Sequence, residues 1–336
     1  MITIVDIAKE SGYSVSTVSR VLNNKKDVSP VAKQKIMEIV EAHKFVPNNN
    51  AKHLKQGVTK NILAFVKGTS NMLFASIIEE IQTIIADTEY SLRVYYLDEE
   101  ENEVAEAVRF CRERKPLGVL FLGGNPQFFK EQFAQITMPS ILVTNRGDAL
   151  GFPNLSSIAI DDVAAAEEAV DYLIEQGHRN IGVIGGDRFV STTVMDRFLG
   201  CQKSFEKHGM TFDAEHYYER GRFAFDSAYQ ATEKLLDKAR PISAVFAMSD
   251  TMAVGAIRAI RDRGLDVPED ISVVGFDGIS LAEYYNPKIV TIHQGYKRLA
   301  SRSIEMLIAM IEKNQEATHE IIPFELQMGE SVKTLE

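Results

Sequence analysis

Four side chains between residues 15 and 20 have the types and spacing to read the edges of DNA base pairs. They are Val15, Ser16, Ser19 and Arg20. On a helix that begins near residue 15, they would lie off the apolar stripe and share one polar surface. Short hydroxyls beside one arginine make a surface thin enough for a major groove, and the arginine fork suits guanine. The segment therefore predicts hydrogen bonding to a DNA duplex.

The residues around this surface predict a turn followed by a helix. Gly12 suits a sharp turn because glycine adopts the left-handed conformation at little cost. Ser14 can cap the next helix through its hydroxyl. Val18, Val21 and Leu22 recur at helical spacing and would form the buried stripe of that helix.

Two further short helices would complete the N-terminal domain. The first is expected over residues 4–11, where Thr3 and Asp6 resemble a capping box. The third would begin at Ser29-Pro30, a cap residue followed by proline at the first helical position. Its apolar stripe would consist of Ile36, Ile39 and Val40.

Charge is distributed unevenly along the chain. Residues 1–60 contain ten Lys or Arg and five Asp or Glu, a net charge of +5, whereas the whole chain carries −10, which leaves −15 for residues 61–336. A basic head on an acidic body is typical of a DNA reader with a soluble sensor domain. A solvated bundle of surface helices would explain the charge as well, but it would not explain the turn-helix pattern.

Residues 2–57 resemble the DNA-binding head of the lactose-repressor/galactose-repressor (LacI/GalR) family. Residues 3–8 (TIVDIA) and 17–23 (TVSRVLN) carry much of the likeness, with residues 45–48 (FVPN) and 51–54 (AKHL) beyond them. The likeness extends to the C-terminus and covers nearly the whole chain. Tyr13 departs from the valine usual in the turn, which bears on the packing there and not on the fold.

The resemblance implies roles in DNA binding for twelve residues. Val15, Ser16 and Arg20 would contact base edges, while Ser14, Thr17 and Ser19 would hold phosphates. The other members of the expected DNA-contacting set are Thr3, Asn23, Ala51, Lys52, Leu54 and Lys55.

Residues 48–56 resemble the hinge helix of the family. Pro47 ends the preceding segment, and a helix this short is marginal alone, so we expect it to be unfolded without DNA and to order on binding. Leu54 would then push between base pairs from the minor groove, with Lys52 and Lys55 along the groove walls. Alternatively, Leu54 packs against its twin in a dimer, and the two roles are compatible.

The remainder of the chain is expected to be an ordinary soluble α/β body without catalytic motifs. No apolar run approaches membrane-spanning length, and no signal peptide is expected at the start. Cys111 and Cys201 lack metal-ligand or redox spacing and should be buried.

Nucleotide-binding, hydrolase and metalloprotease motifs are absent from the sequence, so no cofactor, no metal and no enzymatic activity are expected. His178 is expected to be structural, and Asp161-Asp162 to begin a helix.

Strands and helices alternate through this body, which predicts parallel sheets covered on both faces. Apolar runs stand at 61–66, 92–97, 117–122, 140–144, 181–184, 243–247 and 271–276. Helical patterns stand at 74–88, 101–114, 162–176, 196–208, 226–238, 250–263 and 296–313. So many strands fit two doubly wound halves better than one sheet. The chain would cross between the halves near residues 157–161 and cross back near 290–294.

The expected fold is an α/β protein with a three-helix head, a hinge helix and a two-lobed core similar to periplasmic sugar-binding proteins. The expected domains are residues 1–46 for the helix-turn-helix, 47–60 for the hinge and linker, and 61–336 for the core. One lobe would contain residues 61–158 and 294–322, and the other residues 159–293 and 323–336.

Ligands of such sheets bind outside the carboxyl ends of the strands, and that rule selects polar residues at strand ends. The resemblance singles out Asn145, Arg197, Phe223, Ser249, Asp277 and Gln294 as effector-contacting positions, and the strand-end rule selects Ser70 and Asn71 as well. Phe74 completes the expected effector-binding set. Ser249 replaces an asparagine found in several sugar-responsive members. Carboxylates and arginines grip vicinal hydroxyls, and an aromatic ring covers an apolar sugar face. The alternative is that these residues are structural caps and ion pairs, an interpretation that we favour for Asp250.

The sequence thus predicts a cytoplasmic, nucleoid-associated transcriptional regulator, most simply a repressor of carbohydrate-utilisation genes. Its partners would be a near-palindromic DNA operator, a second copy of itself, and a small effector such as a sugar or sugar phosphate. A dimer is expected, since no leucine heptad tail follows the last predicted strand. The alternatives are a nucleobase-responsive or phosphocarrier-responsive regulator of the same family, or a sugar-binding protein without DNA activity. A protein of that last kind would not need the basic head.

Overall fold

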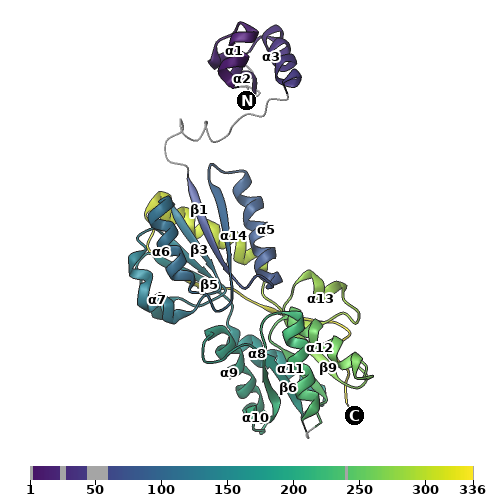
Figure 1. The fold of residues 1–336 in the computed structure, drawn as a ribbon. Helices are drawn as coiled ribbons and strands as arrows, with labels where there is room; N and C mark the ends of the chain where they lie inside the picture. Colours follow the sequence, from purple (N-terminus) through teal and green to yellow (C-terminus); the bar gives the residue numbers. More distant parts are fainter. Residues whose placement is uncertain (1–2, 23–27, 44–59, 239–240, 336) are drawn as a thin grey trace. The chain divides into compact units, whose positions relative to one another are not determined.

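The computed structural model describes residues 3–22, 28–43, 60–238 and 241–335, and the chain divides into two compact units, Met1–Thr59 and Lys60–Glu336 (Figure 1). The expected hinge helix over residues 48–56 lies outside the described residues, as does Asn23. No helix of the described part is long and apolar enough to cross a membrane.

The first unit contains the three predicted short helices, α1 (Ile4–Ser11), α2 (Val15–Leu22) and α3 (Pro30–Ala42). Its core is formed by the residues Ile7, Ala8, Val18, Val21, Ile36 and Val40. Leu22 and Ile39, which the apolar pattern placed in the buried stripes, are only partly buried at the rim of this core. Tyr13 also packs against the core, so the larger side chain is accommodated in the turn.

The second unit contains two six-stranded sheets. The first sheet has the order β11-β5-β4-β3-β1-β2 and the second β12-β10-β9-β8-β6-β7. All neighbouring strands run parallel except β12, which is antiparallel to β10. The predicted two doubly wound halves are confirmed.

The strands of the first sheet are β1 (Asn61–Lys67), β2 (Ser91–Leu97), β3 (Gly118–Leu122), β4 (Ser140–Val143), β5 (Leu155–Ala159) and β11 (His319–Ile321). Its helices are α5 (Met72–Ala86), α6 (Glu103–Arg114), α7 (Pro126–Gln132) and α14 (Tyr296–Lys313), with single 3-10 turns at Phe133–Gln135 and Asp148–Leu150. Alternate residues of β1 face opposite clusters: Ile62 lies in the cluster with α5 and α14, and Leu63 in the cluster with α6 and α7. Both faces of this sheet are therefore covered by helices.

The strands of the second sheet are β6 (Ile181–Gly185), β7 (Tyr218–Arg220), β8 (Ala244–Ala247), β9 (Ser272–Asp277), β10 (Val290–His293) and β12 (Glu325–Gln327). Its helices are α8 (Asp162–Glu175), α9 (Thr192–Lys207), α10 (Ala214–Tyr217), α11 (Phe225–Asp237), α12 (Asp250–Asp262) and α13 (Ser280–Tyr284). α8 and α9 cover one face of the sheet, and α11 and α12 cover the other.

Glycine permits the close packing of both helix pairs. A Cβ on Gly200 in α9 would lie 2.3 Å from the carbonyl oxygen of Val163 in α8, and one on Gly255 in α12 would lie 2.4 Å from that of Phe225 in α11. No larger residue fits at that separation, because real Cβ contacts are longer. Gly200 thereby fixes how α9 is seated, and α9 carries one of the predicted effector residues, Arg197.

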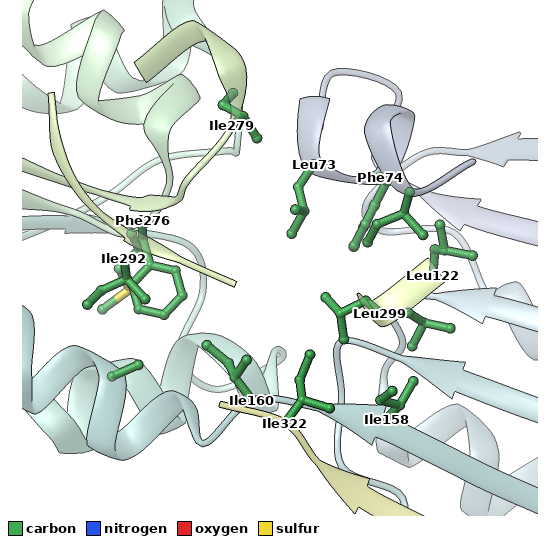
Figure 2. Close-up of a cluster of buried hydrophobic side chains, with 14 of the residues drawn as sticks. Leu73, Phe74, Leu122, Ile158, Ile160, Phe276, Ile279, Ile292, Leu299 and Ile322 are labelled. Carbon is green, nitrogen blue, oxygen red and sulfur yellow. The ribbon is translucent and has the colours of Figure 1, made fainter. Parts of the chain in front are cut away.

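The chain passes between the sheets three times: after β5, after β10 and between β11 and β12. The sequence patterns indicated passages near residues 157–161 and 290–294, and the expected lobe bounds placed a third near residue 322. Ile160 and Ile322 lie buried at the passages, between Phe276 and Ile292 of the second sheet and Leu73 and Phe74 of α5 (Figure 2). The two halves thus share a continuous apolar cluster at their junction.

Candidate functional site

The exposed face of α2 presents the side chains predicted to contact DNA. Val15 is 39% exposed, Ser16 and Arg20 are exposed, and Ser19 is partly exposed. Val18 and Val21 on the opposite side are buried in the head. The amphipathic division predicted for this helix is confirmed.

Two hydroxyl residues of the predicted DNA-contacting set, Ser14 and Thr3, cap helices of the head. Ser14 Oγ accepts a hydrogen bond from the Thr17 amide at 3.2 Å, so it caps α2 as predicted. Thr3 forms the predicted capping box with Asp6, whose amide donates to Thr3 Oγ1 at 3.3 Å while Asp6 Oδ2 accepts from the Thr3 amide at 2.9 Å. These bonds, chiefly from Thr3, lower the pKa of Asp6. Gly12 ends α1 with φ 74°, in the left-handed conformation expected of it.

Five residues of the predicted DNA-contacting set cannot be placed. Asn23, Ala51, Lys52, Leu54 and Lys55 lie outside the described residues.

A cavity of about 390 Å³ lies within the second unit, where carboxyl ends of strands from both sheets meet. Seven of the nine predicted effector residues line it: Asn71, Phe74, Asn145, Arg197, Phe223, Asp277 and Gln294. Phe74 and Asn145 come from the first half, Arg197 and Phe223 from the second. The cavity therefore brings together predicted residues that are far apart in the sequence, some selected by the strand-end rule and some by the resemblance.

The other two predicted effector residues lie off the cavity lining. Ser70 is exposed in the turn before α5. Ser249 is 2% exposed, and its Oγ accepts the Met252 amide at 3.1 Å, which makes it the N-cap of α12. Its hydroxyl is engaged by the helix, so the structure places Ser249 as a cap at the strand end, and Ser70 in solvent.

Arg197 is the centre of a buried ion network in the cavity wall. Its Nε donates to Asp162 Oδ1 at 2.8 Å and its Nη1 to the Met248 carbonyl at 2.6 Å, while Asp277 Oδ1 lies 4.0 Å from Nη1. The guanidinium carbon lies 3.7 Å from the ring centroid of Phe276. Because planar guanidinium, carboxylate and ring constrain one another, the cation is held in one orientation toward the cavity.

Burial controls the protonation of the carboxylates in this wall. It raises the pKa of Asp162 to about 6, although the charge of Arg197 works in the opposite direction. Burial likewise raises the pKa of Asp277, against the effects of Arg197 and of Gln294, whose Nε2 donates to Asp277 Oδ1 at 2.7 Å. In both carboxyls, burial therefore favours the neutral form and the neighbouring Arg197 favours the charged form.

Two of the residues at the cavity edge have unusual backbone conformations. Asp277 has φ 116° and Thr144, which precedes Asn145, has φ 71°. Non-glycine residues rarely adopt such angles, and they persist where the surroundings fix them. Asp277 ends β9 and Thr144 directly follows β4. The backbone strain therefore lies at strand ends that line the cavity.

Asp250 has the structural role that the sequence indicated. It is fully buried, accepts Thr291 Oγ1 at 2.5 Å and the Ile279 amide at 2.9 Å, and does not line the cavity. Burial and the neighbouring Asp277 raise its pKa. Asp161 caps α8 as predicted, and the buried His178 bonds to Ser243 Oγ at 2.9 Å.

Polar contacts join the two halves around the cavity. Asn145 Nδ2 donates to Thr193 Oγ1 at 2.9 Å, which links β4 of the first half to α9 of the second. On another side, Arg222 Nη2 donates to Asp98 Oδ2 at 2.6 Å and the Phe223 amide to Glu99 Oε1 at 3.2 Å. These hydrogen bonds stabilise the present angle between the lobes, and the lobes could change that angle only by breaking them.

Sequence reasoning missed several residues of the wall. Lys67 ends β1 and Glu99 follows β2, so the strand-end rule, applied to every strand, would have found both. Arg220 and Arg222 lie at and after β7, a strand of three residues with no periodic signal. Phe128 is on α7, a helix that the sequence patterns did not predict, and Thr193 is in the first turn of α9, which the predicted pattern began at residue 196.

Comparison with known proteins matches both units of the chain. Residues 3–48 match the family model of bacterial regulatory proteins of the lacI family, and residues 170–332 match that of a periplasmic binding protein-like domain. The HTH-type transcriptional regulator MalR of Clostridium butyricum is 38% identical over 96% of this chain and 97% of its own length. The HTH-type transcriptional repressor PurR of Histophilus somni (strain 129Pt) is 31% identical over the full length of both chains.

Among solved structures, a complex of the transcriptional regulator CelR with cellobiose is similar with a TM-score of 0.71 and 25% identity, over 98% of this chain and 100% of the other. The Lac repressor dimer bound to operator and the anti-inducer ONPF has a TM-score of 0.75 at 22% identity, over 99% of each chain, which shows a shared fold.

Proposed function

Because the chain belongs to the LacI family of bacterial regulatory proteins, and is thus a DNA-binding transcriptional regulator, we propose that it represses carbohydrate-utilisation genes under the control of a sugar or sugar phosphate. The cavity between the lobes carries this proposal. It is concave, set at strand ends, and lined by both hydrogen-bonding side chains and phenylalanine rings. That combination suits a ligand with hydroxyls on its edge and an apolar face.

The head would bind the operator through α2. Val15, Ser16 and Arg20 would contact base edges, and Ser14, Thr17 and Ser19 the phosphates. Two copies of the chain would occupy the half-sites of a near-palindromic operator. Residues 48–56 would order over the minor groove between them, with Leu54 as the wedge.

Effector binding would act through the angle between the lobes. Asn145, Arg222 and Glu99 contribute contacts between the two halves beside the cavity, so a ligand that touches both halves can favour one arrangement. A ligand shifts such an equilibrium only by its preference for one state. We propose that the sugar-bound arrangement separates the hinge attachments of the two chains and releases the operator.

The same proposal assigns no catalysis to the chain and places it in the cytoplasm, at the nucleoid. We propose the domain division expected from the sequence: a head over residues 1–46, a hinge and linker over 47–60, and an effector-binding and dimerisation core over 61–336.

In vitro selection of a near-palindromic operator from random DNA, followed by fluorescence anisotropy against a panel of sugars, tests this function. We expect enrichment of one palindromic motif and its release by at least one sugar. Asp277→Ala should bind that sugar more weakly by calorimetry, since Asp277 lines the cavity beside Arg197. Failure to enrich any DNA motif would overturn operator recognition, and equal sugar binding by both proteins would remove Asp277 from the site.

A further inference from the structure

We propose that the effector is an uncharged, hydroxyl-rich molecule, and that the cavity excludes phosphorylated and carboxylated sugars. This inference rests on the proposed function, which leaves sugars and sugar phosphates open. It is drawn from the ion pairs of the cavity wall, where every cation already has a carboxylate partner among the described residues.

One of the two buried cations is Lys67, at the end of β1. Its Nζ lies 2.6 Å from Glu103 Oε2, and the two side chains are 11% and 1% exposed. The other carboxylate oxygen of Glu103 accepts the Asn125 amide at 2.6 Å, and Lys67 Nζ lies 4.9 Å from the ring centroid of Phe128. A buried pair with this many bonds does not release its cation to a ligand without leaving Glu103 charged and unpaired, which is costly.

The second half of the cavity repeats the arrangement. Arg197 is bonded to Asp162 as described above, and Arg220 Nη1 lies 2.8 Å from Asp187 Oδ2. Both arginines therefore have a carboxylate partner, in a buried pair for Arg197 and in a pair at 63% side-chain exposure for Arg220, and an anion would compete with that partner for the cation.

The fourth cation, Arg222, is held by the opposite lobe. Its Nη2 bonds Asp98 at 2.6 Å and its Nε lies 3.4 Å from Glu99, while Glu99 also accepts the Phe223 amide. Asp98 and Glu99 follow β2 of the first half, and Arg222 follows β7 of the second. The cluster of Asp98, Glu99 and Arg222 joins the two lobes and pairs the charge of Arg222 with two carboxylates.

Carboxylates outnumber cations in and around the wall. The acids that line the cavity or pair with its cations are Asp98, Glu99, Glu100, Glu103, Asp162, Asp187 and Asp277. The four cations remain in the minority even when the two carboxyls with raised pKa, Asp162 and Asp277, are protonated. A phosphate, which brings about −1.5 to −2 charges at neutral pH, would therefore meet like charge.

At two helix N-termini of the cavity, which could attract an anion, a side-chain cap occupies one backbone amide. Asn71 Oδ1 accepts the Leu73 amide at 3.0 Å at the start of α5, and Ser191 Oγ accepts the Val194 amide at 3.3 Å at the start of α9. The wall also carries the uncharged groups of Asn145, Thr193 and Gln294; the amide nitrogens of Asn145 and Gln294 donate to Thr193 and Asp277, and no charge is left unpaired when a ligand replaces those bonds by its own hydroxyls. Amides and hydroxyls, together with the rings of Phe74, Phe128 and Phe223 in the lining, match a neutral sugar.

Calorimetry of the full chain against glucose, maltose, cellobiose, glucose 6-phosphate, maltose 6-phosphate and hypoxanthine tests this inference. We expect a neutral sugar to bind and its phosphate to bind at least about 100-fold more weakly, because juxtaposed like charges are costly. Asp98→Asn combined with Glu99→Gln should release Arg222. The ratio of the dissociation constants of the phosphorylated and the neutral sugar should then fall by about tenfold. Glu206→Gln, an exposed acid of α9 outside the cavity lining, should leave the ratio unchanged.

The ratio of the two dissociation constants in the wild-type protein tests the exclusion of anions even if the double variant does not fold. A phosphorylated sugar that binds as tightly as its neutral form would overturn the exclusion of anions while leaving the proposed function intact. A protein that binds hypoxanthine or none of the sugars would instead overturn the sugar effector, and this inference with it.

Discussion

Replacing Arg20 by alanine will abolish the preference of the protein for its operator and leave weak, salt-sensitive binding to DNA. Arg20 lies on the exposed face of α2, on the side opposite the buried Val18 and Val21. A bidentate contact to guanine is worth about 1–3 kcal/mol of base discrimination. Both heads of the proposed dimer lose it, so operator affinity should fall by roughly 2–6 kcal/mol in total.

Fluorescence anisotropy with operator and scrambled DNA, over a range of salt concentrations, measures this effect. Lys35→Ala is the matched control because it removes one exposed cation from α3 instead of α2. The control should weaken binding to both DNAs at most slightly and keep the preference. An Arg20→Ala protein with wild-type sequence preference would contradict the assignment of α2 as the recognition helix.

Replacing Arg197 by methionine will destabilise the core by about 3–5 kcal/mol, the usual cost of removing one partner from a buried ion pair. Methionine keeps much of the side-chain stem but leaves Asp162, at 6% side-chain exposure, without its cation. Removal of the positive charge should raise the pKa of Asp162 and Asp277 further. The loss of stability should therefore be smaller at pH 5, where the carboxyls can be protonated, than at pH 8.

Arg263→Met provides a control from the same lobe. Arg263 also bonds two carboxylates, Glu233 at 2.9 Å and Asp237 at 2.8 Å, but at 36% side-chain exposure. Surface pairs contribute about 0–1 kcal/mol, so urea unfolding should show little change for this variant. Equal losses for the two variants, or a loss at Arg197 that does not vary with pH, would argue against the buried network.

Local signals predicted the head well because its helices are specified by neighbouring residues. The Thr3–Asp6 capping box, Gly12 and the Ser29-Pro30 start all act within one helical turn, and each is found in the structure. The parallel strands were also predictable, since strands buried on both faces are continuous apolar runs.

The parts that escaped prediction depend on contacts distant in sequence. β7 has three residues and is recognisable only by its pairing with β6, so Arg222 could not be placed at the cavity. Ser249 stands at a strand end, as a ligand-contacting residue would, yet its hydroxyl bonds to the next helical turn. Sequence position alone cannot distinguish a cap from a ligand contact at such an end. The pairing of Lys67 with Glu103 likewise joins residues 36 positions apart.

Coupling between the cavity and the head is the central claim, and thermodynamics makes it reciprocal. If a sugar lowers operator affinity by some factor, the operator lowers sugar affinity by the same factor, which is typically about 5- to 150-fold. A protein in which the two sites merely coexist would show neither effect.

The most direct test is to measure operator affinity with and without a saturating neutral sugar, and sugar affinity with and without saturating operator. We predict that both dissociation constants rise by one common factor of at least about fivefold. A sugar that binds the cavity and leaves operator affinity unchanged would contradict the account.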